Sequence, residues 1–150
     1  MNISNSFQIS ASGLTAQRLR MDVISSNIAN VETTRAKVEN GESVPYRRKV
    51  VVMSPSETSF EQALQSAMGQ SSKGSGVKVT GIQEDNSEFK LVYNPTHPDA
   101  NSNGYVSMPN VDMAKEMIDM LVASRSYEAN ITALNATKSM IMKALEIGKG

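Results

Sequence analysis

The sequence predicts an α+β protein with long N- and C-terminal helices forming an antiparallel coiled-coil-like hairpin, and with a small β-rich middle domain inserted between them. Proline is absent from residues 3–31 and from every position after Pro109, and in both stretches apolar residues recur every seven positions. Four of the five prolines and six of the nine glycines fall within residues 35–104, where short β-prone runs replace the heptads. The expected parts are an N-terminal helical assembly segment at 1–34, a β-rich middle domain at 35–108 and a C-terminal helical assembly segment at 109–150.

The N-terminal helix carries one apolar row spaced by seven residues and a second row offset from it. Its interior contains a cluster of small residues and Gly13, which costs about 1 kcal/mol relative to Ala. These small residues either let another backbone come close or break the helix. Asn27 and Asn30 suit the end of the helix, because Asn tolerates the left-handed conformation of a C-cap. The apolar positions expected at an assembly interface are Phe7, Leu14, Met21, Ile24 and Ile28.

The C-terminal helix is expected to begin with Asn110 as its N-cap and to stop at Gly148. At about 1.5 Å per residue it would be roughly 55 Å long, longer than a domain of this size is wide. Ile118, Leu121 and Val122 widen its apolar stripe, which indicates more than one neighbour. The heptad positions expected at the assembly interface are Met113, Met117, Met120, Tyr127, Ile131, Leu134, Ile141 and Leu145.

Between the helices, β-branched runs bounded by turn residues predict strands. A run of three valines between Pro45 and Pro55 is typical of a strand core. Residues 60–68 have the spacing of a short amphipathic helix, and a Ser/Gly-rich loop follows at 70–76. The predicted strands cover residues 46–53, 77–83, 88–93 and 105–108, the second and third forming an antiparallel pair about a turn at Asp85 and Asn86.

The amino-acid composition excludes several classes of partner and binding site. The chain has 150 residues, zero formal net charge, 39% apolar and 5% aromatic residues, and neither Trp nor Cys. Zero net charge argues against nucleic acid or an anionic membrane as the partner, and the absence of Cys removes disulfides and thiolate sites. The sequence has no apolar run long enough for a membrane span and no pattern of a cleaved signal peptide near its start. We therefore expect no membrane insertion and, for an exported chain, a route that reads no cleaved leader.

His97, the only histidine, lies between two prolines and close to Asp99. One histidine without a second strong ligand at regular spacing is a poor metal site, so we expect a rigid turn with the imidazole hydrogen-bonded to backbone. Asp99, Asn101 and Asn103 have the spacing of part of a calcium loop, but the terminal Glu of that loop is missing. We predict no catalytic residue, no metal site and no cofactor.

Several charged and methionine residues have two interpretations. Arg47, Arg48 and Lys49 either line the rim of a strand with their stems over apolar surface or grip a phosphate or an acidic partner. Arg125 and Glu128 either form a weak surface pair or fix the register between subunits. Six methionines in the C-terminal third either provide an adaptable face for non-identical neighbours or fill gaps inside the hairpin.

Three separated motifs occur in order along the chain. The N-terminal motif comprises Ser12-Gly13-Leu14, Arg18, Asn27-Ile28-Ala29-Asn30-Val31 and Thr33-Thr34. The middle motif comprises Asn94-Pro95-Thr96-His97-Pro98-Asp99-Ala100 and Gly104-Tyr105-Val106. The C-terminal motif comprises Asn110-Val111-Asp112, Glu116-Met117 and Arg125-Ser126-Tyr127-Glu128-Ala129-Asn130. Together they resemble the rod and hook proteins of the bacterial flagellar axis, and the middle motif is similar to that of proximal rod proteins, although Glu32 departs from the small polar residue expected there.

The resemblance implies a structural subunit of the proximal rod of the flagellar basal body, a drive shaft that polymerises helically through its terminal helices. It implies as partners other copies of the chain, other rod proteins and the flagellar type III export apparatus, which would pass the chain across the cytoplasmic membrane without cleavage. The residues carrying the family motif would be Asn27, Ala29, Asn30, Thr33, Arg125, Tyr127, Glu128 and Asn130.

The residue pattern independently fits this implication, because a rod needs contacts that repeat without closing into a ring, and long amphipathic ends supply them. Both helices have poor helix formers in their interiors, so we expect the ends of an isolated chain to become ordered on association. The rival hypotheses are a self-contained helical adaptor and a metal-dependent hydrolase centred on His97.

Overall fold

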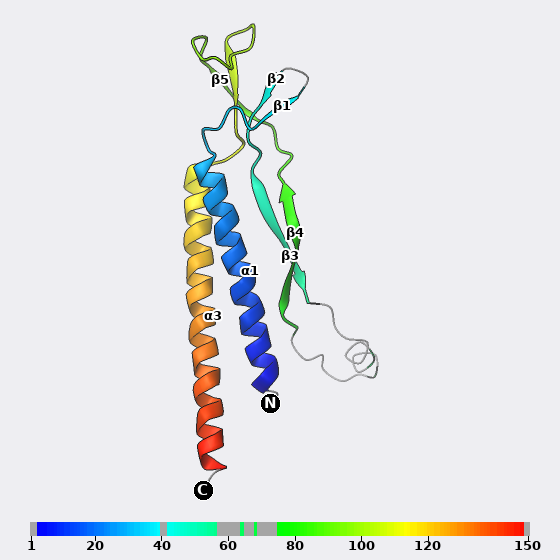
Figure 1. Cartoon of the computed structure of the whole chain (residues 1–150), viewed down its shortest axis with the longest axis vertical. Coiled ribbons are helices and arrows are strands. Elements are labelled where there is room, and N and C mark those ends of the chain that lie inside the picture. The colour runs from blue at the N-terminus through cyan, green and yellow to red at the C-terminus, as the bar shows by residue number, and fades with distance from the viewer. Residues whose placement is uncertain (1–2, 40–41, 57–63, 65–67, 69–74, 149–150) are drawn as a thin grey trace. The chain divides into compact units, whose positions relative to one another are not determined.

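The computed structural model describes residues 3–39, 42–56, 64, 68 and 75–148. Within them, a long helix lies near each end of the sequence and small strand pairs lie between, which is consistent with the expected α+β class (Figure 1). The elements in order are α1 (Ile3–Ala29), β1 (Lys37–Glu39), β2 (Glu42–Val44), β3 (Lys49–Pro55), β4 (Val77–Glu84), β5 (Lys90–Tyr93), β6 (Tyr105–Met108) and α3 (Met113–Ile147). Neither helix has the length and apolar content of a membrane span in the part of the chain so described.

Helix α1 runs without a break through Gly13, so the small residues there do not interrupt it. It ends as predicted at Asn30, whose backbone N–H donates to Ser26 O at 3.2 Å and whose side-chain amide donates to the same oxygen at 2.8 Å. Asn27 does not cap the helix, contrary to the prediction. Its side chain is buried and makes contacts with β3 and α3 instead.

Helix α3 begins later than the sequence predicts, because Asp112 and not Asn110 is its N-cap. The Asp112 carboxylate accepts hydrogen bonds from the N–H groups of Ala114 (3.0 Å) and Lys115 (3.3 Å), which have no partner inside the helix. The Asn110 side chain is used elsewhere. Gly148 follows the last helical residue, as predicted.

The strands were located well by the sequence, but their pairing was not. The predicted pair of 77–83 with 88–93 is wrong, because β4 pairs with β3 and β5 pairs with β6. Between β4 and β5, the Asp85 backbone bonds instead to the Arg48 carbonyl (2.8 Å) and the Asn110 amide (2.9 Å), so no hairpin turn forms. The β5–β6 pair is antiparallel, and its connection ends at Gly104, whose φ of 77° favours glycine.

The short antiparallel pair of β1 and β2 was not predicted, although the Asn40-Gly41 dipeptide between them in the sequence is a common hairpin signal. The predicted helix at 60–68 and loop at 70–76 lie almost entirely outside the described residues.

The chain forms two compact units. Unit 1 comprises Met1–Leu19, Val52–Gly81 and Ala123–Gly150, and unit 2 comprises Arg20–Val51 and Ile82–Val122. In unit 1, Gly13 lies against Asn130 of α3 so closely that a Cβ at Gly13 would be 3.1 Å from the Asn130 amide nitrogen. The small residue therefore permits a close approach, one of the two interpretations of Gly13.

The start of β4 also packs closely against α1 in unit 1. Ser12 Oγ donates to the Ile9 carbonyl at 2.7 Å and accepts the Val77 N–H at 3.1 Å. A Cβ at Gly76 would be 2.5 Å from the same hydroxyl oxygen, so only glycine fits at this position without movement.

Unit 2 contains the more substantial core. Its buried apolar residues are Val23, Ile24, Tyr46, Val106 and Val111. Two polar side chains lie among the most buried of the described residues, Asn27 at 1% exposure and Glu116 at 0%. A core that contains a carboxylate must provide partners for it, and these partners define the candidate site.

Candidate functional site

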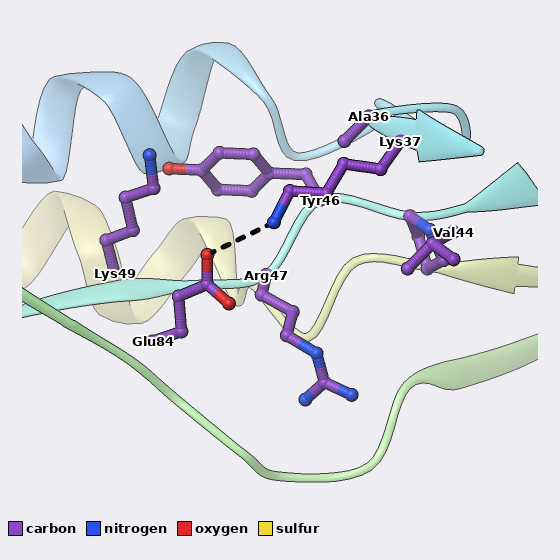
Figure 2. Close-up of a pocket in the computed structure, with 8 residues that line it drawn as sticks. Ala36, Lys37, Val44, Tyr46, Arg47, Lys49 and Glu84 are labelled. Atoms are coloured by element: carbon purple, nitrogen blue, oxygen red, sulfur yellow. Dashed lines mark ion pairs between the residues drawn. The ribbon is translucent and has the colours of Figure 1, made fainter. Parts of the chain in front are cut away.

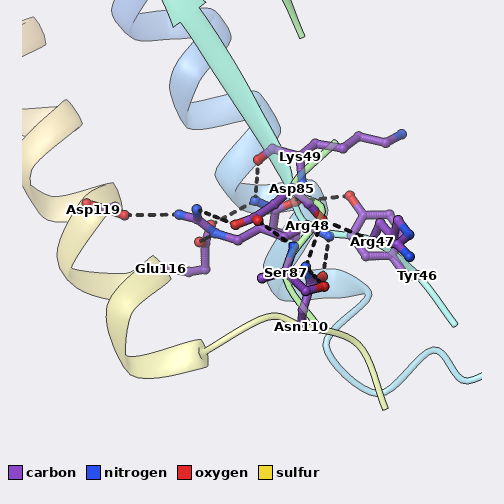
Figure 3. A network of polar contacts seen from close by, with 10 residues as sticks. Tyr46, Arg47, Arg48, Lys49, Asp85, Ser87, Asn110, Glu116 and Asp119 are labelled. Atoms are coloured by element: carbon purple, nitrogen blue, oxygen red, sulfur yellow. Dashed lines mark hydrogen bonds and ion pairs between the residues drawn. The ribbon is translucent and has the colours of Figure 1, made fainter. Parts of the chain in front are cut away.

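The carboxylate of Glu116 is at the centre of a buried polar network in unit 2 (Figure 3). Glu116 lies in the first turn of α3, and its two oxygens accept hydrogen bonds from Arg48 Nε at 2.6 Å and from Asn27 Nδ2 at 2.9 Å. Removing a carboxylate from water is unfavourable unless it is paired and hydrogen-bonded, and both conditions are met here. The interaction joins α1, α3 and the residues preceding β3.

Asn27 uses its whole amide group in this network. Its nitrogen donates to Glu116 and to the Lys49 carbonyl (2.9 Å), and its oxygen accepts from the Tyr46 hydroxyl (3.0 Å) and the Lys49 N–H (2.9 Å). Both donors and both acceptor positions of the amide are therefore occupied. Neither Asp nor Leu could replace it without leaving buried partners unsatisfied.

Arg48 connects the network to two further carboxylates, Asp119 at 3.5 Å and Asp85 at 3.6 Å. Burial acts to lower the pKa of the Arg48 guanidinium, but the hydrogen bond and charge of Glu116 and the two other carboxylates raise this pKa above its usual value overall. The Arg48 side chain therefore does grip acidic groups, but those of its own chain.

Asn110 completes the network from the backbone side. Its side-chain oxygen accepts a hydrogen bond from the backbone N–H of Arg48 at 2.8 Å. Its side-chain nitrogen donates to the Asp85 carbonyl and to Ser87 Oγ (2.8 Å). The Ser87 backbone N–H, with further help from its hydroxyl and from Arg48, holds the pKa of Asp85 below its usual value. The arrangement fixes the positions of Arg48, Asp85 and Ser87 relative to one another.

The charged groups of Arg47 and Lys49, the sequence neighbours of Arg48, lie near aromatic rings of the same chain. The Arg47 guanidinium lies over the Phe89 ring, 4.4 Å from its centre, and Lys49 Nζ lies 5.6 Å from the centre of the Tyr46 ring. Both line an open pocket of about 340 Å³, where Lys37 and Glu84 form a long ion pair of 3.9 Å (Figure 2).

A second polar cluster in unit 2 is centred on Asp99. Its carboxylate accepts hydrogen bonds from Arg35, Thr34 Oγ1 (2.9 Å) and Ser43 Oγ (2.9 Å). The Arg35 hydrogen bonds, followed by those of Thr34 and Ser43, hold the pKa of Asp99 at about 2. The predicted turn at His97 is confirmed, because its Nδ1 accepts the Asp99 backbone N–H at 3.1 Å. Within the described ranges, no group of three or more His, Asp or Glu is placed to hold a metal ion.

The heptad rows of α3 lie on two sides of the helix. In one predicted row, Met113 is exposed, and the residues that follow it, Met120, Tyr127, Leu134 and Ile141, are half-buried. The row beside it on the covered side is Glu116, Ala123, Asn130 and Thr137, of which all but Asn130 are buried. The sequence instead predicted the row containing Met117 and Ile131, which is exposed. Small and polar residues make up the covered row, so a search for apolar residues alone does not find the side of α3 that packs within the chain.

Among the exposed residues of the first three turns of α3, five are large and apolar, and we call the surface that they form the outer face. It consists of Met113, Met117, Ile118, Leu121 and Val122. Met113, Met117 and Leu121 follow one another at four residues, as do Ile118 and Val122, and Ile118 is three residues from Leu121, so they are neighbours on the helix surface. Farther along α3, Arg125 and Glu128 form an exposed ion pair at 2.9 Å, which leaves both interpretations of these residues open.

The other predicted interface residues differ in burial. On α1, Ile24 is buried, Leu14, Met21 and Ile28 are half-buried, and Phe7 is exposed. On α3, Met113, Met117, Ile131 and Leu145 are exposed. Among the motif residues, Asn27 joins the network and Thr33 Oγ1 donates to Asn30 Oδ1 at 3.1 Å, whereas Ala29 is exposed. The sequence analysis did not predict that Tyr46, Arg48 and Glu116 belong to one site. The only signal in the sequence is that Glu116 is a charged residue seven positions before Ala123.

The comparisons with known proteins agree at both ends of the chain. A family model described as "Flagella basal body rod protein" matches residues 7–37, which include Asn27. A second, described as "Flagellar basal body rod FlgEFG protein C-terminal", matches residues 102–147, which include Glu116.

Curated proteins similar over the full length carry the name flagellar basal-body rod protein FlgC. The protein of Bacillus subtilis (strain 168) is 61% identical over 150 residues, covering 99% of this chain and 100% of the relative. That of Borreliella burgdorferi is 43% identical over 161 residues and covers 100% of both chains. That of Salmonella typhimurium is 42% identical over 149 residues, covering 99% of this chain and 100% of the relative.

Proposed function

This chain belongs to the FlgC family of flagellar basal-body rod proteins, and we propose that it builds the proximal part of the rod by helical polymerisation through its two terminal helices. It is a structural subunit of the bacterial flagellar basal-body rod, and its family is one of structural proteins, not enzymes. Its partners in this proposal are other copies of itself and other rod proteins.

The observation that carries the assembly proposal is the outer face of α3. Five large apolar side chains are exposed within ten residues, while the opposite side of the same turns is fixed by the Glu116 network. Helices of folded proteins bury such a stripe against a neighbour. Here the stripe is available to another subunit.

The helices are proposed to pair as an antiparallel coiled-coil-like hairpin. The hydrogen bond between Asn27, late in α1, and Glu116, early in α3, supports this direction. In the proposal, residues 1–34 and 109–150 are the assembly segments, and 35–108 are the middle domain. The chain reaches the basal body through the flagellar type III export apparatus without cleavage, and it enters neither a membrane nor a nucleic-acid complex.

Leu121→Lys tests the proposal. The side chain is 59% exposed, so the substitution leaves the midpoint of urea unfolding nearly unchanged, whereas a lysine would have to be desolvated in a covered face. We expect a strain dependent on this variant to lose rods in electron micrographs of isolated basal bodies and to lose motility. The matched control is Gln83→Lys, at an exposed polar position of β4 outside the two proposed assembly segments, which should retain both rods and motility.

Normal rods with Leu121→Lys would show that the outer face is not an assembly surface. Removal of residues 131–150 separates the rod subunit from a self-contained adaptor, because an adaptor would still assemble without them.

A further inference from the structure

Two of the five residues in the outer face of α3 are methionines with accessible side chains. Met113 is 45% exposed and Met117 is 60% exposed, and they are four residues apart on one side of the helix. Their apolar neighbours are Ile118, Leu121 and Val122, which have no side-chain hydrogen-bond donor. Their thioethers are therefore open to small oxidants as long as the face is uncovered.

Oxidation of a thioether by a hydroperoxide changes the character of such a surface. The sulfur attacks the distal peroxide oxygen, the O–O bond breaks, and an S–O bond forms. Hydrogen peroxide is reduced by two electrons and leaves as water, and the side chain becomes a sulfoxide. The product carries a strong acceptor oxygen where the methionine had an apolar group.

We propose that Met113 and Met117 are oxidation sites whose conversion to sulfoxide by hydroperoxides excludes the subunit from the rod. The inference rests on the proposed assembly through the outer face. If a neighbour covers that face, the sulfoxide oxygen is removed from water among side chains that offer it no donor, which is unfavourable. Oxidation therefore acts only before incorporation, because a covered face excludes the oxidant.

The chain contains internal controls for this proposal. Met68 is 76% exposed but lies outside α3, so it should oxidise readily without affecting assembly. Met120 lies in the same turns as Met117 but is half-buried on the covered side, so it should oxidise more slowly. Met68 therefore controls for exposure of the thioether without a role in assembly, and Met120 controls for position in α3 without full exposure.

The test treats cells regenerating flagella with a sublethal pulse of hydrogen peroxide and compares the chain in the unassembled pool with the chain in isolated basal bodies. Peptide mass spectrometry measures the sulfoxide fraction at each methionine. We expect sulfoxide at Met113 and Met117 to be depleted in basal bodies by about tenfold. Sulfoxide at Met68 should be equal in the two pools. The double variant Met113→Leu/Met117→Leu should form rods without peroxide and lose fewer of them after the pulse, whereas Met68→Leu should give no protection.

A second measurement separates failure of this inference from failure of the assembly proposal. Intact basal bodies are treated with peroxide after isolation, and protection of Met117 relative to Met68 is expected. Equal sulfoxide at Met117 in the two pools, together with protection in intact basal bodies, would overturn the inference alone. Rapid oxidation of Met117 in intact basal bodies would show that the face is not covered and would overturn both.

Discussion

At the scale of single residues, the Glu116 carboxylate connects distant parts of the chain, since it bonds to Asn27 and Arg48, which lie 89 and 68 residues earlier in the sequence. Its position in α3 makes it part of the covered side of the helix, where the next residues of the same row are Ala123 and Asn130. A carboxylate in such a row provides specificity of pairing, because only a partner with donors at the right positions satisfies it.

Glu116→Gln should destabilise the chain by about 2–4 kcal/mol, because it leaves the Arg48 guanidinium partly buried without its nearest counter-charge. Urea unfolding followed by circular dichroism measures the effect. The matched control is Glu128→Gln, which breaks the exposed pair with Arg125 in the same helix and should cost less than about 0.5 kcal/mol. Equal effects of the two substitutions would contradict the role assigned to the network.

Gly76→Ala should destabilise unit 1 by about 1–3 kcal/mol, because the new methyl would lie 2.5 Å from Ser12 Oγ. Gly81→Ala is the control, since a Cβ there meets nothing within 4 Å. Combining Gly76→Ala with Ser12→Ala removes the hydroxyl that clashes, so the double variant should be less destabilised than the sum of the two single variants in thermal unfolding. Simple additivity would show that the close contact is absent in solution.

The Asp99 cluster gives a pH dependence with a defined sign. The folded-state pKa of about 2 is below the ordinary value of 3.8, so the ionised cluster stabilises the fold above pH 3.8 and this contribution is lost as the pH falls towards 2. The difference in urea midpoint between the wild type and Asp99→Asn should be constant from neutral pH to about pH 5 and should shrink below it. A difference independent of pH down to 2 would contradict the assignment.

The sequence indicated which residues are important for the structure, but it did not indicate their hydrogen-bond partners. Asn27 was selected as a helix cap from local rules, and its actual contacts lie 22 and 89 residues away. Arg48 had two interpretations for the same reason. Local rules did succeed for Asn30 and His97, because the groups they bond to are four residues or fewer away.

At the scale of elements, both long helices, β3, β4, β5 and β6 were predicted close to their observed bounds. Periodicity and β-branched runs are local signals, so they identify an element but not its neighbour. The apolar period of α3 was correct, whereas the covered row contains Glu116, Asn130 and Thr137, which a count of apolar residues cannot find. Strand pairing failed similarly, since it depends on the contacts of Asp85 with Arg48 and Asn110.

The two ends of α3 should differ in hydrogen exchange. Residues 138–147 are exposed apart from Ile141, so their helical hydrogen bonds are supported by little packing. In the isolated chain, backbone amides of 138–147 should exchange at least about tenfold faster than those of 116–130, measured by mass spectrometry. The reference is the assembled rod, in which the proposal requires both segments to be protected. Equal protection of the two segments in the monomer would contradict the idea that the end of α3 awaits a partner.

At the scale of the whole molecule, the described residues form a small apolar core. Few large apolar side chains are fully buried in the described ranges, and much of the apolar content of α3 faces solvent. An assembling subunit can distribute its apolar residues in this way because neighbours supply the missing burial. The resemblance of the two ends to flagellar axial proteins was visible from sequence motifs, whereas the location of the exposed stripe required the structure.

The order of the Glu116 network along the chain constrains how unit 2 acquires its shape. Asn27 and Arg48 come early, and the carboxylates of Glu116 and Asp119 come only in the final third. A polypeptide that emerges with its amino end first, from a ribosome or from a narrow conduit, therefore carries unmatched donors until residue 119 has followed. Unit 2 can therefore complete its fold only after most of the polypeptide has emerged.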